Sequence, residues 1–481
     1  MPAPVAWRGV GAIAGGLVAL LVAVSGRYGY HRDELYFLAA GRHLDWGYVD
    51  QPPLTPLLAR VMSAVVGDSL VGLRVLPALM AGATVLVAAL IARELGGRRS
   101  EQLLAAGATA MSAIVLVNGH WLSTSSLDLL VWALLSWLTI RAVRSGGRSW
   151  LWLGLVAGIG LQNKTLVIFL LAALLIGLLI AGPRRAFRDR WLWAAGGLAL
   201  LLWLPNLIWQ GLNGWPQLEL SSAIAAGSSG SSQPWWLFLP FQVVLVAPFL
   251  LPVWVAGLVW VLRSPQVRFL GVAYVILVVL FMITGGKPYY VVGLYPALLA
   301  AGSLPTISWV RAGARRRRVL LGLAFVLSLP NLILMLPLLP ERLLGPVVAV
   351  NYDVGETVGW PLFAATVGDA YGSLPADTEP VVITRNYGEA GAIERYRPRI
   401  PVYSGHNAYW DWGPPPDSSR SAVFVGFPRE RVSAWCADPV EFARIDNRIG
   451  LDNDEQDAPV WTCTSLTASW SELWPQFRRL G

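Results

Sequence analysis

Long apolar segments recur through the first 340 residues of this chain, and they constrain its fold more than any other feature. Each is close to the length of about 20 residues that a helix needs to cross a lipid bilayer. Only 14% of the 481 residues are charged, and the mean hydropathy is +0.54, so the composition is not that of a soluble protein. The 24 tryptophans suit the boundary between lipid and water. We therefore predict a polytopic α-helical membrane protein.

The apolar segments predict about eleven transmembrane helices. The first follows Arg8 and is interpreted as an uncleaved helix and not as a signal peptide, because further spans come after it. The expected spans are residues 9–26, 70–92, 103–119, 122–140, 150–163, 165–182, 191–209, 236–262, 269–285, 288–304 and 319–339.

Arginines in the short loops between these segments account for much of the net charge of +8. Residues 184–190 and 315–318 are examples. Such clusters are typical of cytoplasmic loops, so the basic charge reflects membrane topology and no nucleic-acid partner is expected. The pattern predicts a plasma-membrane protein whose N-terminus is cytoplasmic and whose C-terminal residues are extracytoplasmic.

Residues 341–481 lack long apolar segments and are predicted to form a small extracytoplasmic α/β domain. Residues 379–384 and 421–426 have the composition of short strands between loops rich in proline and glycine. The two cysteines of the chain, Cys436 and Cys463, both lie in this domain. In an oxidising compartment such a pair favours a disulfide, and two free buried thiols are the alternative.

Three segments of the transmembrane module, residues 1–340, are expected on its outer side. Residues 27–69 form a long polar loop, in which we expect the active site. Residues 210–235 end in a glycine- and serine-rich stretch without hydrophobic periodicity, which predicts a mobile loop. Residues 285–290 form a tight turn.

Two adjacent carboxylates, Asp33 and Glu34, follow the first span in loop 27–69. Residues 35–38 are predicted to continue as a short amphipathic helix along the membrane interface. Partial desolvation beside a bilayer raises the basicity of a carboxylate, and an oriented carboxylate can take a proton from an attacking hydroxyl. In the alternative interpretation, Asp33 only caps a helix or pairs with Arg32.

Further motifs follow in order along the chain. They are Leu44-Asp-Trp-Gly-Tyr-Val-Asp-Gln-Pro-Pro-Leu54, Leu73-Arg-Val-Leu-Pro77, Leu161-Gln-Asn-Lys164, Pro205-Asn-Leu-Ile-Trp209, Lys287-Pro-Tyr-Tyr290 and Leu294-Tyr-Pro-Ala-Leu298. With Asp33 and Glu34, this ordered set resembles the membrane glycosyltransferases of family 39. These include protein O-mannosyltransferases and lipid A aminoarabinose transferases, and they have the GT-C fold.

The resemblance implies transfer of a sugar from a polyprenyl-phosphate carrier at the outer membrane face to a hydroxyl of an acceptor glycan, lipid or protein, usually with inversion. In that scheme Asp33 is the general base, and Glu34 orients the acceptor or the sugar, or holds a divalent metal ion where one is used. A transporter or flippase of lipid-linked sugars, which makes no bond, is the alternative.

Cations on the predicted outer side suit the carrier phosphate. The only lysines of the chain, Lys164 and Lys287, lie at predicted outer ends of spans, against the positive-inside preference. With Arg74, and with the phenols of Tyr289 and Tyr290, they are the candidate phosphate ligands. For the three cations the alternative is a side chain that snorkels to the interface.

One position departs from the family pattern, because Gln51 stands where many bacterial relatives have histidine before the double proline. We therefore predict no metal site there. Asp50 and Gln51 in the first loop, and Asp128 at the outer end of the fourth span, are candidate substrate contacts. His406 and Asp411 lie in an aromatic-rich run of the C-terminal domain that suits binding of a carbohydrate or an acceptor, or packing of the domain on the membrane module.

Overall fold

The computed structural model describes residues 3–227, 234–313 and 315–481. Its internal contacts divide the chain into two compact units. The helical unit comprises Met1–Ser25, Gln51–Thr55 and Val71–Leu336, and the sheet unit comprises Gly26–Asp50, Pro56–Leu70 and Pro337–Gly481. Most of the first predicted outer loop thus belongs to the same unit as the C-terminal residues, whereas the sequence suggested grouping it with the transmembrane module.

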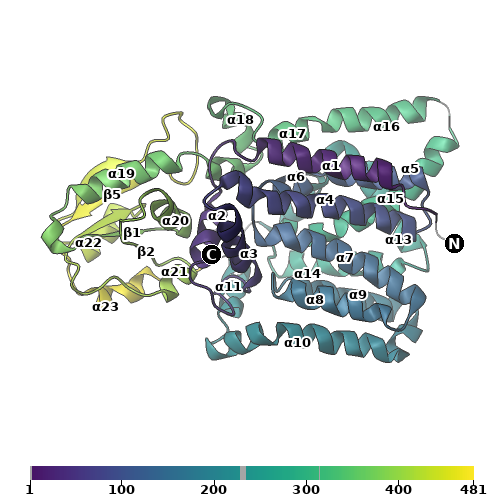
Figure 1. Cartoon of the computed structure of the whole chain (residues 1–481), viewed down its shortest axis with the longest axis horizontal. Helices are drawn as coiled ribbons and strands as arrows, with labels where there is room; N and C mark the ends of the chain where they lie inside the picture. Colours follow the sequence, from purple (N-terminus) through teal and green to yellow (C-terminus); the bar gives the residue numbers. More distant parts are fainter. Residues whose placement is uncertain (1–2, 228–233, 314) are drawn as a thin grey trace. The chain divides into compact units, whose positions relative to one another are not determined.

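Most of the long helices in the helical unit lie side by side and nearly parallel (Figure 1). Its α-helices are α1 (Trp7–Val24), α4 (Leu70–Glu94), α5 (Arg99–Met111), α6 (Ala113–His120), α7 (Thr124–Ser145), α8 (Ser149–Leu161), α9 (Val167–Ala181), α10 (Arg190–Leu212), α11 (Pro216–Ala225), α12 (Phe238–Val246), α13 (Leu251–Arg263), α14 (Arg268–Ile283), α15 (Tyr295–Arg311), α16 (Arg315–Ser328) and α17 (Pro330–Met335). Short 3-10 helices are η1 (Arg184–Arg188), η2 (Trp235–Leu237), η3 (Pro248–Leu250) and η4 (Pro288–Leu294).

A helix or a bent helix pair lies in each of the eleven segments that the sequence predicted as spans. Among the described residues, six helical stretches are long and apolar enough to cross a membrane, and eight are if each bent pair counts as one span. The pair α5–α6 is bent by 61°. The second pair, in which η2–α12 is followed by η3–α13, is bent by 88°. The remaining predicted spans, α8, α9 and α14, have 13, 15 and 16 residues. The chain is a multi-pass membrane protein.

Small residues bring neighbouring helices of this unit close together. A Cβ on Gly257 of α13 would lie 1.9 Å from the carbonyl oxygen of Leu298, and a Cβ on Gly302 of α15 would lie 1.9 Å from that of Val253. Close approach of backbones through glycine is how helices pack where lipid removes the hydrophobic driving force. On the outside, apolar side chains such as Leu201 of α10 are exposed, as a lipid-facing surface requires.

The segment 210–235, predicted as a mobile loop, contains a helix. Helix α11 begins with Pro216 at its first position and continues through Leu218 and Leu220. Proline at the first position of a helix has the backbone φ angle that the first turn needs. Pro216 therefore predicts the start of a helix here, although the segment has no hydrophobic periodicity. Residues 228–233, the glycine- and serine-rich part of the predicted loop, lie outside the described residues.

The sheet unit contains one five-stranded mixed sheet with the order β2-β1-β3-β5-β4. Strand β1 pairs in parallel with β2 and β3, while β5 pairs antiparallel with β3 and β4. The strands are β1 (Val381–Thr384), β2 (Val402–Ser404), β3 (Ala422–Val425), β4 (Val440–Arg444) and β5 (Pro459–Cys463). The helices are α2 (Arg32–Ala40), α18 (Gly345–Val348), α19 (Trp360–Gly372), α20 (Tyr387–Tyr396), α21 (Ala408–Asp411), α22 (Arg429–Trp435) and α23 (Trp470–Leu473), with η5 (Glu341–Leu343), η6 (Tyr352–Thr357), η7 (Ala376–Thr378) and η8 (Trp474–Phe477). Helix α3 (Leu54–Val66) begins in the helical unit and continues into this one.

Helices cover this sheet, and its core is rich in aromatic rings. Phe424 of β3 packs with Trp435 of α22, Trp470 of α23 and Phe477 of η8. Helices α19 and α20 pack against the strands as well. The predicted strands at 379–384 and 421–426, and the predicted α/β class of this part of the chain, are therefore confirmed.

Helix α2 is buried within the protein. Leu35, Tyr36 and Phe37 are each at most 5% exposed, and the helix packs against α20. The predicted short helix is therefore present, with residues 35–37 covered by other parts of the protein, while its place at a membrane interface stays a prediction. The apolar residues run consecutively instead of marking one face, so they favour a helix that is surrounded by protein.

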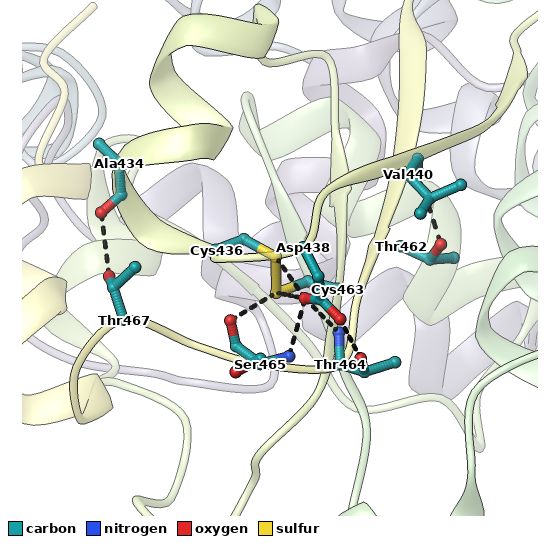
Figure 2. Close-up of a disulfide and its surroundings, with 9 residues drawn as sticks. All are labelled: Ala434, Cys436, Asp438, Val440, Thr462, Cys463, Thr464, Ser465 and Thr467. Carbon is teal, nitrogen blue, oxygen red and sulfur yellow. Dashed lines mark hydrogen bonds between the residues drawn. A yellow bond between two sulfur atoms is a disulfide. The ribbon is translucent and has the colours of Figure 1, made fainter.

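A disulfide joins Cys436, at the end of α22, to Cys463, at the end of β5, and confirms the predicted pairing (Figure 2). Asp438 holds the neighbouring turn, because its Oδ1 accepts hydrogen bonds from the backbone N–H groups of Thr464 at 3.2 Å and Ser465 at 3.0 Å. Cys436, Asp438 and Cys463 lie close together, but the two sulfurs are bonded to each other. The cysteines therefore offer no thiolate ligands to a metal ion.

Candidate active site

Asp33 and Glu34 occupy the first turn of α2 but have different surroundings. The helix begins after His31, whose Nδ1 accepts a hydrogen bond from Asp33 N at 3.2 Å. The Glu34 carboxylate is fully buried, and its Oε2 accepts a hydrogen bond from His31 N at 2.9 Å, which closes a capping box. The Asp33 side chain remains 32% exposed. Asp33 is therefore the more accessible carboxylate of the pair.

The Asp33 carboxylate is held by a tyrosine from the far end of the sequence. Tyr387 Oη donates a hydrogen bond to Asp33 Oδ1 at 2.9 Å. Arg32 Nε lies 4.0 Å from the same oxygen, while the Arg32 guanidinium pairs with Glu356 at 3.3 Å and Asp454 at 3.0 Å. Pairing of Asp33 with Arg32, the alternative raised from the sequence, is therefore a long contact, since Arg32 is held mainly by the other two carboxylates.

Asp50 forms a second polar centre in the same unit. Tyr36 Oη donates a hydrogen bond to Asp50 Oδ1 at 2.7 Å, and Asn407 Nδ2 lies 3.5 Å from Oδ2. Asn407 adopts a left-handed backbone conformation, with φ of 50°. Burial raises the pKa of Asp50 to about 6, although both hydrogen bonds oppose that change.

His406 lies beside these groups and is only 5% exposed. Its Nδ1 accepts a weak hydrogen bond from Tyr387 N at 3.4 Å, and its ring packs on the Tyr387 ring at 4.6 Å. Burial, followed by the charge of Arg479, lowers the pKa of His406 well below its usual value, so the ring is neutral. The Nε2 atom then carries the proton and has no partner among the described residues. Asp411, the other predicted contact in this run, is exposed on α21.

In the helical unit, Lys164 and Lys287 gather around one phenol ring. Lys164 Nζ lies 5.7 Å and Lys287 Nζ lies 5.8 Å from the centre of the Tyr289 ring, and Lys164 is 5.9 Å from that of Tyr290. Lys164 Nζ also donates a hydrogen bond to Ser125 Oγ at 3.0 Å. The chain has only two lysines, and they are 123 positions apart in the sequence (287 − 164). Both belong to one cationic and phenolic cluster.

The double-proline motif binds directly to the motif that contains Lys164. Leu54 N donates a hydrogen bond to Gln162 O at 2.9 Å, and Thr55 Oγ1 donates one to Asn163 Oδ1 at 2.7 Å. Gln51, at the start of the motif, is 2% exposed, and neither polar atom of its amide has a partner among the described residues. A buried amide without partners is costly, which marks Gln51 as a candidate ligand contact.

The two remaining candidates of the helical unit are buried. Asp128 is 7% exposed and interacts electrostatically with Lys164. Arg74 is 1% exposed, donates a hydrogen bond to Ser25 O at 2.8 Å, and lies 3.4 Å from His120 Nε2. Arg74 therefore does not snorkel to an interface, and its guanidinium contacts a backbone carbonyl.

Tyr36, Ser125 and Thr55 were not recognised from the sequence as site residues. Tyr36 lies within a run of apolar residues. Ser125 is one of several consecutive serine and threonine residues, and no motif distinguishes it from the others. Only the contacts reveal them. Asn163 is different, because it is part of a motif that already stood out.

Known proteins match parts of this chain. The family described as dolichyl-phosphate-mannose-protein mannosyltransferase matches residues 50–209. Two relatives from Pseudomonas fluorescens (strain Pf0-1) are undecaprenyl phosphate-alpha-4-amino-4-deoxy-L-arabinose arabinosyl transferases 2 and 1. They are 28% identical over 273 residues and 26% identical over 292 residues, which covers 52% and 55% of this chain. The chain spans about half the length of these curated relatives, 48% and 49% respectively.

Similarity of structure extends over nearly the entire chain. The crystal structure of ArnT from Cupriavidus metallidurans in the apo state matches with a TM-score of 0.63 at 15% identity, and the alignment covers 95% of this chain and 98% of that one. The same protein bound to undecaprenyl phosphate matches with a TM-score of 0.61 at 16% identity, with the same coverage. This chain is therefore a multi-pass membrane protein with the GT-C fold of ArnT, as its sequence motifs implied.

Proposed function

We propose that this chain is a glycosyltransferase that moves a sugar from a polyprenyl-phosphate carrier to an acceptor hydroxyl. The observation that carries the proposal is the cluster of Lys164, Lys287, Tyr289 and Tyr290 in the helical unit. Cations and phenolic hydroxyls are suitable ligands for a phosphate, and the surrounding apolar helices suit a polyprenyl tail. Undecaprenyl phosphate in the ArnT structure, and the names of the curated relatives, support the same class of donor.

In the proposed reaction, the acceptor oxygen attacks the anomeric carbon of the sugar while Asp33 takes the hydroxyl proton. The bond between that carbon and the phosphate oxygen breaks, and its electron pair leaves with the polyprenyl phosphate. Attack opposite to the leaving group inverts the anomeric configuration. Lys164 and Lys287 stabilise the charge that develops on the phosphate.

Roles for the other polar residues follow from their surroundings. Asp50 accepts hydrogen bonds and suits a sugar or acceptor hydroxyl. Gln51 and His406 each have a buried polar atom without a partner among the described residues, so we assign them to the substrate. Glu34 maintains the start of α2 through its capping bond to His31 N, and we propose that it positions Asp33.

Asp128, Arg74 and Asp411 have weaker support as ligands. Asp128 acts through its interaction with Lys164, which keeps the lysine near Tyr289. Arg74 donates a hydrogen bond to Ser25 O through one nitrogen of its guanidinium, and it stays a candidate ligand of the carrier phosphate. Asp411 is exposed and stays a candidate contact of the acceptor.

The test uses the purified full chain in proteoliposomes with two donors, undecaprenyl-phosphate-linked 4-amino-4-deoxy-L-arabinose and undecaprenyl-phosphate-linked mannose. Cell-envelope extract supplies acceptors, and mass spectrometry detects released undecaprenyl phosphate and the glycosylated product. We expect transfer from one of these donors. Asp33→Asn should reduce it by about 10²- to 10⁴-fold, since the general base is lost. Lys164→Ala and Lys287→Ala should each weaken binding of undecaprenyl phosphate by at least about tenfold.

Asp68→Asn is the matched control, because Asp68 is an exposed carboxylate of the same first loop and pairs with Arg395. It should retain full transfer. Full activity in Asp33→Asn would contradict the assignment of the base. Movement of the carrier across the bilayer without any glycosylated product would instead favour a flippase.

A further inference from the structure

We propose that Tyr387 is a positioning residue for the reaction, because its hydroxyl orients the Asp33 carboxylate towards the acceptor. This inference rests on the proposed function. It adds a specific task for the C-terminal α/β part of the chain, which contributes a hydrogen-bond donor to the general base. The contact that carries it is the 2.9 Å hydrogen bond from Tyr387 Oη to Asp33 Oδ1.

The Tyr387 ring has little freedom to move. It stacks on the Tyr36 ring at 4.6 Å with an interplanar angle of 30°, and it packs on the His406 ring at 4.6 Å. Burial raises the pKa of Tyr387 well above its usual value, so the hydroxyl keeps its proton and acts as a donor. A donor that is fixed in this way selects one orientation of the carboxylate.

The start of helix α20 places Tyr387 accurately. Tyr387 is the first residue of this helix, and Asn386 before it caps the helix by accepting a hydrogen bond from Glu389 N at 2.9 Å. Glu389 Oε2 in turn accepts hydrogen bonds from Asn386 N at 3.0 Å and Arg385 N at 2.7 Å. This reciprocal capping fixes the backbone that carries the tyrosine.

Two glycines of α20 allow it to approach α2 closely. A Cβ on Gly388 would lie 2.7 Å from Arg32 Cβ, and a Cβ on Gly391 would lie 2.8 Å from Leu35 Cβ. Both glycines therefore face α2, and the two residues that they meet precede and follow Asp33 in the sequence. The close approach brings the tyrosine hydroxyl within hydrogen-bond distance of the carboxylate.

A carboxylate has two oxygens, and each can act as the base. In the proposed reaction Tyr387 holds Oδ1, and Oδ2 takes the acceptor proton. Loss of the tyrosine hydroxyl would allow the carboxylate to rotate, so productive orientations become rarer while the donor still binds.

The experiment compares Tyr387→Phe with Tyr409→Phe in the full chain. Tyr409 is a matched control, because it is also buried near Tyr36, at 6.3 Å between rings, but its hydroxyl binds Glu394 at 3.0 Å. Tyr387→Phe keeps the stacked ring and removes only the hydroxyl. We expect its kcat for transfer from the active undecaprenyl-phosphate sugar to fall on the order of tenfold, with KM for that donor within about twofold. Tyr409→Phe should keep both constants.

Thermal unfolding of both variants, and their binding of undecaprenyl phosphate, complete the test. A fall in kcat confined to Tyr387→Phe, with equal melting temperatures, supports the positioning role. Unchanged kcat in Tyr387→Phe, or equal losses in both variants that follow their stability, overturns it while sugar transfer itself stands. A wild-type chain that transfers no sugar, by contrast, fails the proposed function.

Discussion

The carboxylate of Asp50 lies where burial and hydrogen bonding act on its proton affinity in opposite directions. Burial is the larger influence, and it raises the pKa from 3.8 to about 6. The folded protein therefore binds a proton at Asp50 more tightly than the unfolded chain does. This contribution to stability is fully present below the unfolded pKa and is lost as the pH rises through about 6. Above pH 6 the group is ionised and accepts hydrogen bonds from Tyr36 and Asn407.

Substrate binding should therefore depend on pH. If ionised Asp50 accepts a hydrogen bond from the sugar or acceptor, KM should rise as the pH falls through about 6, by about tenfold for each unit below that value. Asp50→Asn should raise KM at pH 7.5 and abolish this pH dependence. Steady-state transfer measured between pH 5 and 8 checks both expectations.

Glu389 provides the comparison for that profile. Its pKa is also raised, to about 7, by burial, but its carboxylate accepts hydrogen bonds from the backbone N–H groups of Arg385 and Asn386, just before α20. If KM of Asp50→Asn still rises as the pH falls through about 6, another group causes that rise. This result would contradict the role of Asp50.

Helix α20 and helix α2 depend on each other for their packing. A Cβ at Gly391 would meet Leu35 at its Cβ and at its backbone C and O, at distances of 2.8 to 3.0 Å. Backbone atoms at this distance cannot move without shifting the helix. The same two helices bring Tyr387 to Asp33, so their spacing should matter for both stability and rate.

Gly391→Ala should destabilise the sheet unit by about 1–3 kcal/mol, as expected for an overpacked contact. It should also reduce kcat, because α20 moves away from α2. Gly372→Ala is the control, since Gly372 ends α19 and nothing lies within 4 Å of an added Cβ. That change should be neutral or slightly stabilising. Unfolding by denaturant and transfer rates measure both, and equal behaviour of the two variants would refute the close contact.

The disulfide bears on the topology of the entire molecule. Cys436 and Cys463 close a loop with a sequence separation of 27, which restricts the unfolded chain and stabilises the domain by about 3–4 kcal/mol. Such bonds persist in oxidising compartments. We therefore propose that the sheet unit is extracytoplasmic and that the N-terminus is cytoplasmic, as the arginine-rich loops indicate.

Labelling in whole cells tests this topology, because these are the only two cysteines of the chain. A membrane-impermeant maleimide should label the protein only after an impermeant reductant has opened the disulfide. Labelling that requires permeabilised cells would place the sheet unit in the cytoplasm. Cys436→Ser with Cys463→Ser gives the background of the measurement.

The eleven apolar segments and the two strand segments were predictable because they depend on local composition. A span must be apolar over its length, and a short buried strand such as Val381–Thr384 is rich in β-branched residues. Helix α11 was missed, because its start depends on Pro216 and its length is too short for a clear periodic signal. The packing of α20 on α2 was also not predicted, since it depends on residues more than 350 positions away.

The sequence by itself determined that the chain crosses a membrane several times, that it carries a separate α/β part, and that Asp33, Lys164 and Lys287 were the groups to examine. These conclusions rest on hydrophobicity, residue type and order, which are local properties. Only the tertiary structure decided that Arg74 is buried against a carbonyl and that Tyr387 holds Asp33. Contacts between distant residues decide such roles, because a hydrogen bond depends on distance and direction in space and not on position in the chain.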